Sequence, residues 1–279
     1  MELPPALATE LGPLRRCEAV GVRGGTWRLE REDGPALLKR MAPERTPEAV
    51  AAVLAELRAS DPPRAPALLR AVRLAEPADS EPAERAPWYG LFSWLDGAPR
   101  RAEDTGWATA WPQVLALLGA LREVRTPASG LPLLTELWLR RVTAMAHPGA
   151  IAGLLREQLV EHPPQGPLRL AHGDFGLQNL VWHAGEVALV DWEELGLAPA
   201  EFDGGWLLAM STMGATPSLR PTELRSQLLA LGLEDERLRW YHGLALLRLS
   251  WRTRALSLPA AQAGAIAQRV RAAMVELLR

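Results

Sequence analysis

A polar insert between two apolar runs restricts the possible folds of this chain more than any other feature. Residues 170–182 read Leu-Ala-His-Gly-Asp-Phe-Gly-Leu-Gln-Asn-Leu-Val-Trp, so short segments typical of buried strands flank Asp174 and Asn179. Asp191 comes twelve residues after Asn179, at the end of a third apolar run. A loop between such strands presents side-chain oxygens at one edge of a rigid sheet, so the pattern indicates a chemical site.

The types and spacing of these residues are those of a kinase catalytic loop followed by a metal-binding Asp. Phosphoryl transfer needs a carboxylate that orients the attacking hydroxyl. It also needs an amide oxygen and a second carboxylate that hold Mg²⁺ on the phosphates. Asp174, Asn179 and Asp191 are a carboxylate, an amide and a carboxylate in this order.

The amino-terminal part of the chain favours strands. Alternating residues on both sides of Asp33-Gly34 predict a β-hairpin within residues 17–41. Thr46-Pro47-Glu48 combines an N-cap, a first-turn proline and a first-turn acid, which predicts a helix to about Ser60. Two further strands are expected over residues 68–74 and 88–95.

The composition changes at Asp96-Gly97-Ala98-Pro99, which is the predicted boundary between a domain over 1–95 and a domain over 96–279. Beyond it the apolar spacing is mostly helical. Helices are expected over residues 111–124, 131–146 and 151–160, and again from about residue 203. The predicted fold class is therefore α+β, with a strand-rich amino-terminal domain and a mostly helical domain that carries a small β-insert.

The composition argues against several classes of protein. The 31 basic and 33 acidic residues nearly cancel, and no basic run is interleaved with aromatic residues, so a nucleic-acid partner is not expected. Cys17 is the single cysteine, which excludes an internal disulfide framework and a cysteine-based zinc cluster; it reads as a half-buried strand thiol. No apolar run approaches the roughly 18 residues of a spanning helix. We therefore expect a cytoplasmic protein without a membrane partner.

The motifs resemble those of the aminoglycoside phosphotransferase and choline kinase superfamily, a group of protein-kinase-like small-molecule kinases. The resemblance rests on His172-Gly-Asp174-x4-Asn179, on Asp191-Trp-Glu, and on Asp203 followed by Gly-Gly-Trp. It implies a two-lobed protein-kinase-like fold, with a β-rich nucleotide-binding lobe and a mostly helical lobe that holds the catalytic loop and the substrate site.

The resemblance also implies roles for these residues. Asp174 corresponds to the catalytic Asp, and Asn179 and Asp191 correspond to the Mg²⁺ ligands. Asp203 corresponds to an anchor of the catalytic loop, and His172 to a scaffold residue that hydrogen-bonds backbone. The implied cofactors are ATP and Mg²⁺.

A single lysine, Lys39, stands among 30 arginines and ends the return strand of the first hairpin. Kinases of this general fold hold the α- and β-phosphates with a lysine on the third strand. Because an ammonium is a compact point charge and a guanidinium is a wide planar fork, Arg would overfill the same space. The expected acidic partner of Lys39 is Glu48, with Glu56 as the alternative.

The remaining nucleotide contacts are expected at a turn and a strand end. The turn that ends at Thr26 is expected to cover the phosphates with its amides. Residues 91–97 resemble the hinge of the family, where backbone groups bind adenine, which makes Ser93 and Trp94 candidate contacts.

The predicted function is transfer of the γ-phosphate of ATP to a hydroxyl of a small molecule. Only eleven residues separate Asp191 from Asp203 and no Ala-Pro-Glu follows, so a protein kinase activation segment is missing. A carboxy-terminal segment from Arg237 to Arg279 holds eight arginines and one acid, which disfavours a polycationic aminoglycoside and makes a neutral or anionic alcohol competitive.

Two alternatives remain open. Eleven tryptophans are compatible with an aromatic cage for choline or another amino alcohol. However, Trp240, Leu244, Leu247 and Trp251 have the helical spacing that is typical of a core. The other alternative is a nucleotide-binding pseudokinase that regulates a partner; it predicts the loss of a phosphate or metal group, and no such group is missing. The sequence leaves the oligomeric state open.

Overall fold

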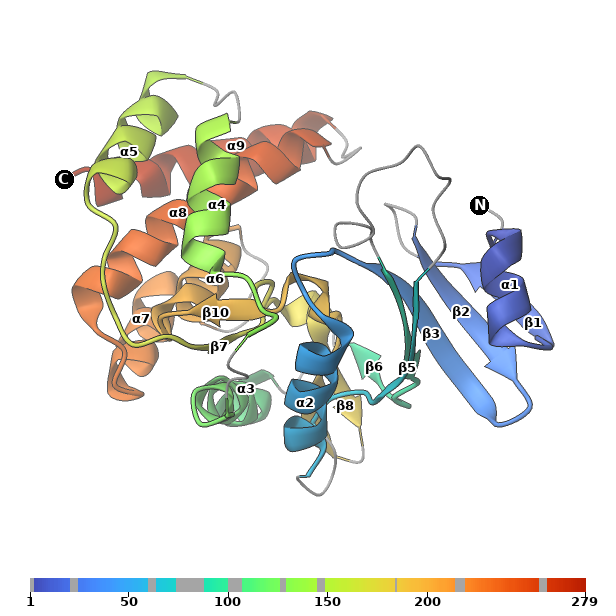
Figure 1. The fold of residues 1–279 in the computed structure, drawn as a ribbon. Helices are drawn as coiled ribbons and strands as arrows, with labels where there is room; N and C mark the ends of the chain where they lie inside the picture. The colour runs from blue at the N-terminus through green and yellow to red at the C-terminus, as the bar shows by residue number, and fades with distance from the viewer. Residues whose placement is uncertain are drawn as a thin grey trace. The chain divides into compact units, whose positions relative to one another are not determined.

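The computed structural model describes residues 3–20, 25–59, 64–73, 88–99, 107–125, 129–144, 149–183, 185–213, 219–255 and 260–279. The chain forms two compact units (Figure 1). Unit 1 comprises Met1–Ala98, Arg125–Pro132 and Val181–Leu195, and unit 2 comprises Pro99–Val124, Leu133–Leu180 and Gly196–Arg279. The chain first changes unit at Ala98, close to the predicted boundary, but two later segments return to unit 1. The division into domains at residue 95 stays a prediction.

Unit 1 contains a five-stranded antiparallel sheet with the strand order β1-β2-β3-β5-β4. Its elements are α1 (Pro5–Leu11), β1 (Arg16–Ala19), β2 (Thr26–Arg31), β3 (Gly34–Met41), α2 (Pro47–Arg58), β4 (Leu68–Arg73) and β5 (Trp88–Ser93). The helix α1 packs on this sheet, where Leu7 and Leu11 join Trp27, Leu29 and Leu38 in one apolar cluster (Figure 1). Burial of these apolar side chains stabilises the packing of α1 against the sheet.

Local sequence chemistry explains these elements. Gly34 follows the β2–β3 turn with a φ of 116°, a conformation that a side chain would disfavour. The hydroxyl of Thr46 accepts a hydrogen bond from the Ala49 backbone N–H at 3.3 Å and caps α2. The register of β2 and β3 places Thr26 directly opposite Lys39.

A second, three-stranded sheet has the order β6-β8-β9. Its strands are β6 (Ala98–Pro99), β8 (Leu180–His183) and β9 (Glu186–Leu189), and a 3-10 turn, Trp192–Glu194, follows β9. Gly97 lies so close to β8 that a Cβ there would meet the Trp182 carbonyl oxygen at 2.7 Å. The Asp96-Gly97 break therefore lets the chain pass against a strand.

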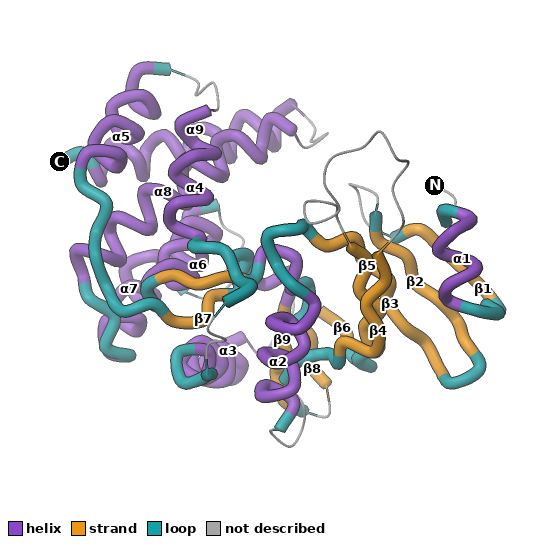
Figure 2. Tube along the Cα trace, in the orientation of Figure 1, coloured by secondary structure: helices purple, strands orange, loops and turns teal. Residues whose placement is uncertain are grey.

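Unit 2 is mostly helical, as the purple tubes of Figure 2 show. Its helices are α3 (Trp107–Leu121), α4 (Leu134–Ala144), α5 (Ala150–Glu161), α6 (Glu201–Thr212), α7 (Pro221–Ala230), α8 (Asp235–Ala255) and α9 (Ala260–Leu277). β7 (Arg169–Ala171) pairs antiparallel with β10 (Gly196–Ala198), and a 3-10 turn spans Leu177–Asn179. The core of unit 2 gathers residues of α4, α5, α6, α8 and α9.

The structure confirms the predicted α+β class and most predicted elements. Sequence analysis missed α1 and the pairing of β7 with β10. The expectation of a half-buried Cys17 is wrong, because β1 is an edge strand and this thiol is exposed. Leu244 and Leu247 of α8 are buried, as expected for residues of a core, whereas Trp251, which has the same helical spacing, is exposed.

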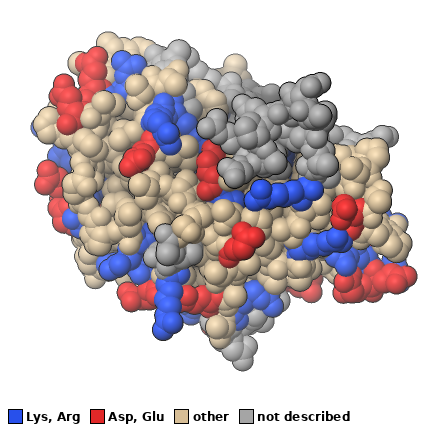
Figure 3. All heavy atoms as spheres, viewed as in Figure 1, with Lys and Arg blue, Asp and Glu red and all other residues tan. Residues whose placement is uncertain are grey.

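Two surface properties follow from the described residues. No described helix combines the length and the apolar character needed to cross a membrane. On the face drawn in Figure 3, basic and acidic side chains are interspersed, in line with a formal net charge of -2.

Candidate active site

The predicted site residues fall into two groups, one in each unit. Unit 2 holds His172, Asp174, Asn179 and Asp203, and unit 1 holds Lys39 and Asp191. Unit 1 also holds the four other predicted nucleotide contacts, Thr26, Glu48, Ser93 and Trp94.

Asp203 fixes the start of the polar loop in unit 2. Its two carboxylate oxygens accept hydrogen bonds from the backbone N–H groups of His172, at 2.7 Å, and Gly173, at 3.0 Å. Asp203 is fully buried at the start of α6, and this burial raises its pKa to about 6 even though the two backbone donors act in the opposite direction. The loop that carries Asp174 is thus held by backbone bonds to one buried carboxyl.

Asn179 closes the same loop. Its side-chain NH₂ donates to the backbone carbonyl of Asp174 at 2.8 Å, and its own backbone N–H donates to the carbonyl of Gly176 at 2.9 Å. Because the NH₂ end of the amide is used in this way, the group that Asn179 offers to a cation is its Oδ1.

Two arginines of α8 meet the carboxylate of Asp174. Arg252 donates from Nη1 to Oδ1 at 3.0 Å and from Nη2 to Oδ2 at 3.4 Å, and Arg248 Nη2 lies 3.7 Å from Oδ1. Burial alone would raise the pKa of Asp174, but the two guanidinium groups outweigh it and hold this pKa below its ordinary value. Asp174 is therefore a buried carboxylate that stays ionised.

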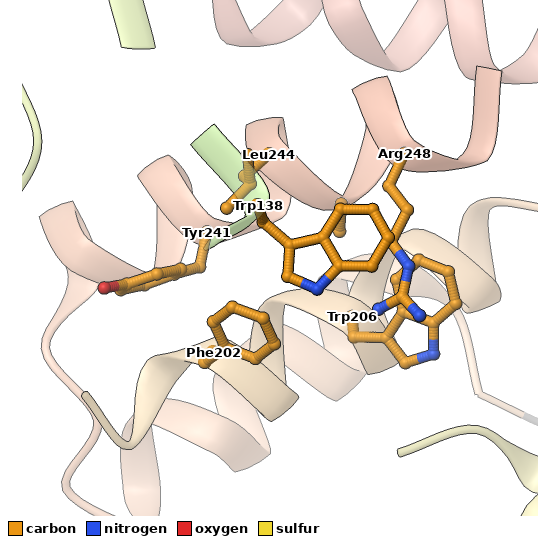
Figure 4. A pocket seen from close by; sticks show the side chains of 7 residues that line it. Trp138, Phe202, Trp206, Tyr241, Leu244 and Arg248 are labelled. Atoms are coloured by element: carbon orange, nitrogen blue, oxygen red, sulfur yellow. The ribbon is translucent and has the colours of Figure 1, made fainter. Parts of the chain in front are cut away.

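Arg248 is held between two indole rings. Its guanidinium lies 4.0 Å from the Trp138 ring centroid and 4.1 Å from that of Trp206 (Figure 4). It also donates to the backbone carbonyl of Gly173. The same rings, with Phe202 and other side chains, line a cavity of about 10 Å³, enough for roughly one water molecule.

In unit 1, Lys39 lies between two carboxylates. Its ammonium contacts Asp191 and lies 3.0 Å from Glu193 Oε2. Burial disfavours the charged form of Lys39, but the two carboxylates outweigh it, so its pKa lies above its ordinary value. Among the described residues, Asp191 is the one non-glycine with a positive φ, 68°, a left-handed conformation that costs backbone energy and that Asp tolerates better than most residues.

The structure does not bring either predicted glutamate to Lys39. Glu48 is exposed in the first turn of α2. Glu56 accepts a hydrogen bond from the Arg125 backbone N–H at 3.0 Å. The observed partners, Asp191 and Glu193, follow β9, and Asp191 lies 152 residues after Lys39, a separation that local sequence pattern does not reveal.

The other predicted contacts have local packing roles in this structure. Thr26 is the cross-strand neighbour of Lys39. Ser93 Oγ accepts from the Ala67 backbone N–H at 2.8 Å, and the Ser93 backbone N–H donates to the Ala67 carbonyl at 2.8 Å. Arg28 lies 4.7 Å from the Trp94 ring.

A buried arginine that sequence analysis did not single out supports the acidic turn of unit 1. Arg45 follows β3, is 1% exposed, and donates from Nε to the Leu195 carbonyl at 2.6 Å. It also pairs with Glu194 at 3.6 Å, and its own carbonyl accepts from Trp88 Nε1 at 2.6 Å. Arg45 thus fixes the segment that follows Asp191 and Glu193.

The donor types fit a hard divalent cation. An amide oxygen and carboxylates are the ligands of Mg²⁺, which usually binds one or two protein carboxylates and completes its shell with water and substrate phosphates. In the part of the chain that the structure describes, no three His, Cys, Asp or Glu side chains cluster as a metal site. Asn179 in unit 2 and Asp191 in unit 1 each offer a side-chain oxygen of this kind.

Comparison with known proteins places this arrangement in a class. Three solved structures share the fold: amicoumacin kinase hAmiN in complex with AMP-PNP, Ca²⁺ and Ami; choline kinase LicA from Streptococcus pneumoniae; and an aminoglycoside phosphotransferase from Streptomyces rimosus in complex with ADP and streptomycin. The first is 15% identical with a TM-score of 0.65, covering 97% of this chain and 92% of that chain. The second is 12% identical with a TM-score of 0.59, covering 96% of each chain. The third is 20% identical with a TM-score of 0.61, covering 87% of this chain and 96% of that chain.

The likeness to these structures shows that the chain has the two-lobed, protein-kinase-like fold. No curated protein matched the sequence. Residues 19–241 match the phosphotransferase enzyme family, and the chain belongs to that family. This finding confirms the resemblance that the His-Gly-Asp and Asp-Trp-Glu motifs predicted.

Sequence analysis missed Arg45, Arg248 and Arg252. Arg248 leaves a signal in the sequence, because it interrupts the apolar run Leu244-Ala-Leu-Leu-Arg-Leu, where a charge needs a partner. Arg252 lies one helical turn further along the same face. Both arginines belong to the basic carboxy-terminal segment, whose composition does not indicate which carboxylate they contact.

Proposed function

We propose that this protein is an ATP-dependent phosphotransferase that transfers the γ-phosphate to a hydroxyl of a small molecule. The observation that carries the proposal is the buried, ionised Asp174, held in a loop whose backbone is fixed by Asp203 and Asn179. Membership of the phosphotransferase enzyme family supports the same reaction class. The hAmiN structure contains AMP-PNP and Ca²⁺, which supports nucleotide and divalent-cation use by this chain.

In this proposal each residue has one role. Asp174 accepts a hydrogen bond from the acceptor hydroxyl and orients its oxygen towards the γ-phosphorus. Lys39 binds the α- and β-phosphates, and Asn179 Oδ1 and Asp191 are the oxygen ligands for Mg²⁺. When bound, the metal ion neutralises charge on the phosphates. Thr26, Glu48, Ser93 and Trp94 stay predicted nucleotide contacts.

The lowered pKa of Asp174 suits a residue that orients the acceptor hydroxyl better than one that removes its proton early in the reaction. A carboxylate with a lowered pKa is a weak base, so it holds the hydroxyl by hydrogen bonding and takes its proton late in the reaction. Because phosphoryl transfer has a loose transition state, positioning of the hydroxyl contributes more than its full deprotonation would.

The choline-like alternative has less support. The aromatic pair Trp138 and Trp206 already encloses a protein cation, Arg248, and the cavity that the pair lines has room for about one water molecule. A quaternary ammonium would need a larger aromatic site.

The test is ADP release by the purified protein with MgATP and a panel of hydroxylated metabolites and antibiotics. An active acceptor should be turned over by the wild type and about 10²- to 10⁴-fold more slowly by Asp174→Asn. Asp235→Asn is the matched control, because Asp235 also pairs with an arginine, Arg225, but at the surface. Binding of MgATP without transfer to any acceptor would favour the pseudokinase.

A further inference from the structure

The carboxylate that should receive the acceptor hydroxyl is already bound on both oxygens. Arg252 meets Oδ1 at 3.0 Å and Oδ2 at 3.4 Å, and Arg248 approaches Oδ1 at 3.7 Å. This side-by-side arrangement is the strong, bidentate pairing of a guanidinium with a carboxylate. Arg252 takes one acceptor position on each oxygen, so a hydroxyl that approaches Asp174 from the side of Arg252 has to displace it.

The two arginines differ in how firmly they are held. The side chain of Arg248 is 3% exposed, is enclosed by Trp138 and Trp206, and also donates to the Gly173 carbonyl. Arg252 follows Arg248 by one turn of α8, and its side chain is 14% exposed. Its guanidinium carbon lies 5.2 Å from the centroid of the Trp206 ring. Arg252 is thus the member of the pair that can move without opening the core.

Movement of Arg252 away from Asp174 has an electrostatic cost. It would leave a largely desolvated guanidinium without its carboxylate, which is strongly unfavourable unless another anion takes its place. A cationic acceptor would add a third positive charge beside Arg248 and Arg252. An acceptor that carries its own anion would instead replace Asp174 as the partner of Arg252.

We propose that the acceptor is an alcohol that also carries a carboxylate or phosphate group, and that this anionic group binds Arg252 and releases Asp174 to orient the hydroxyl. This inference rests on the proposed phosphotransferase function. It makes Arg252 the residue that selects the acceptor by charge, because a hydroxyl without a nearby anion does not release Asp174. The planar fork of the guanidinium matches both carboxylate and phosphate oxygens.

The anion could also be supplied by the nucleotide, since its γ-phosphate has the same chemistry. We favour the acceptor as the source of the anion, because Arg252 contacts Asp174, the residue that we propose binds the acceptor hydroxyl. The nucleotide phosphates have a different proposed partner, Lys39, which would exchange its contacts with Asp191 and Glu193 for contacts with the phosphates. Kinetics separate the two sources. Binding to the acceptor predicts a change in the acceptor KM, and binding to the nucleotide predicts a change in the KM for ATP.

The experiment compares four three-carbon alcohols that differ in charge: D-glycerate, sn-glycerol 3-phosphate, glycerol and 3-amino-1,2-propanediol. The proteins are the wild type, Arg252→Gln and Arg237→Gln. Arg237 is the control because it also lies on α8 and pairs with carboxylates, Glu201 at 3.1 Å and Glu234 at 3.6 Å, but does not contact Asp174. Initial rates of ADP release give kcat and KM for each acceptor and for ATP.

The wild type should use at least one of the two anionic alcohols with a kcat/KM about 10-fold or more above that of glycerol, and the amine should be the poorest acceptor. Arg252→Gln should lower kcat/KM for the anionic alcohol about 100-fold, mainly through KM, with the KM for ATP unchanged. Arg237→Gln should keep the wild-type ratio of kcat/KM between the anionic alcohol and glycerol, and the wild-type KM for ATP, even where the loss of its pair with Glu201 lowers stability.

Several results would overturn the inference. Preferred use of the amine or of glycerol would do so while leaving the phosphotransferase function intact. A rise in the KM for ATP in Arg252→Gln, with the acceptor KM unchanged, would assign Arg252 to the nucleotide. If no alcohol is turned over, thermal unfolding decides: the anionic alcohols must stabilise the wild type and not Arg252→Gln, and equal or absent stabilisation refutes the anion site.

Discussion

The crossing of α6 and α8 allows a sharp prediction about the helix that carries Asp203. At Gly205 the two helices are so close that a Cβ would lie 2.5 Å from the backbone carbon of Tyr241 and 2.7 Å from the backbone nitrogen of His242. At Gly204 a Cβ would instead meet Leu233 Cδ1 at 2.9 Å, the far end of a flexible side chain. The neighbouring glycines therefore differ in what must move.

The expected effects of Gly205→Ala and Gly204→Ala can be worked from these contacts. Alanine in place of glycine inside a helix contributes about 1 kcal/mol of stability through helix propensity in both variants. Overpacking costs about 1–3 kcal/mol, and Gly205→Ala should lie at the upper end because backbone, and not a side-chain tip, has to shift. Net destabilisation should be about 2 kcal/mol for Gly205→Ala and close to zero for Gly204→Ala.

Urea unfolding followed by tryptophan fluorescence measures both variants against the wild type. A shift of the midpoint without a change of the m-value is the expected signature of a pure stability change. Turnover should fall as well in Gly205→Ala, because displacement of α6 also moves Asp203 and the loop that it holds. Equal stability of the two variants would refute the close approach of the helices.

Three further predictions concern buried charges. Lys39→Arg should lower turnover sharply, because the larger fork does not fit between Asp191 and Glu193; a wild-type rate at saturating ATP would contradict the role of Lys39. Arg45→Ala should destabilise the protein by about 3–5 kcal/mol in denaturant unfolding, since it removes a buried cation from its partners, while Arg58→Ala, at the end of α2, should change stability by less than about 0.5 kcal/mol. For Asp203 the folded pKa of about 6 lies above the ordinary value of 3.8, so the folded state binds a proton more readily between these values and gains stability as the pH falls from 7 to 4. The free energy of unfolding of the wild type minus that of Asp203→Asn should rise by roughly 3 kcal/mol over this pH range. A difference that does not change with pH would show that the carboxyl is not desolvated.

The sequence predicted the parts of the structure that depend on short-range chemistry. The turn before Gly34, the Thr46 cap and the polar loop between β7 and β8 are each specified within a few residues. The order of strands and helices followed from these signals, and the order together with the motifs was enough for the fold class. The anchor bonds of Asp203 also agree with the role that the family resemblance implied.

The parts that were missed depend on residues far apart in the chain. Arg252 lies 78 residues after Asp174, and Asp191 lies 152 residues after Lys39. An ion pair between residues so far apart leaves no periodic pattern in the sequence. Reasoning from neighbouring elements therefore paired Lys39 with a glutamate of the next helix. The short helix α1 was missed for a different reason, because its seven residues begin with Pro5 and have no side-chain cap, so burial of Leu7 and Leu11 stabilises it and not its own propensity.

The two groups of predicted site residues, one in each unit, follow one electrostatic rule. In unit 1 a lysine pairs with the predicted metal ligand Asp191, and in unit 2 an arginine pairs with the predicted catalytic carboxylate Asp174. Each carboxylate has to be released for the role that we propose, and each cation then needs a new anion. Nucleotide phosphates can fill that need for Lys39. If the same reasoning holds for Arg252, the acceptor must bring the second anion itself, so substrate charge, and not shape alone, would decide which alcohol this phosphotransferase accepts.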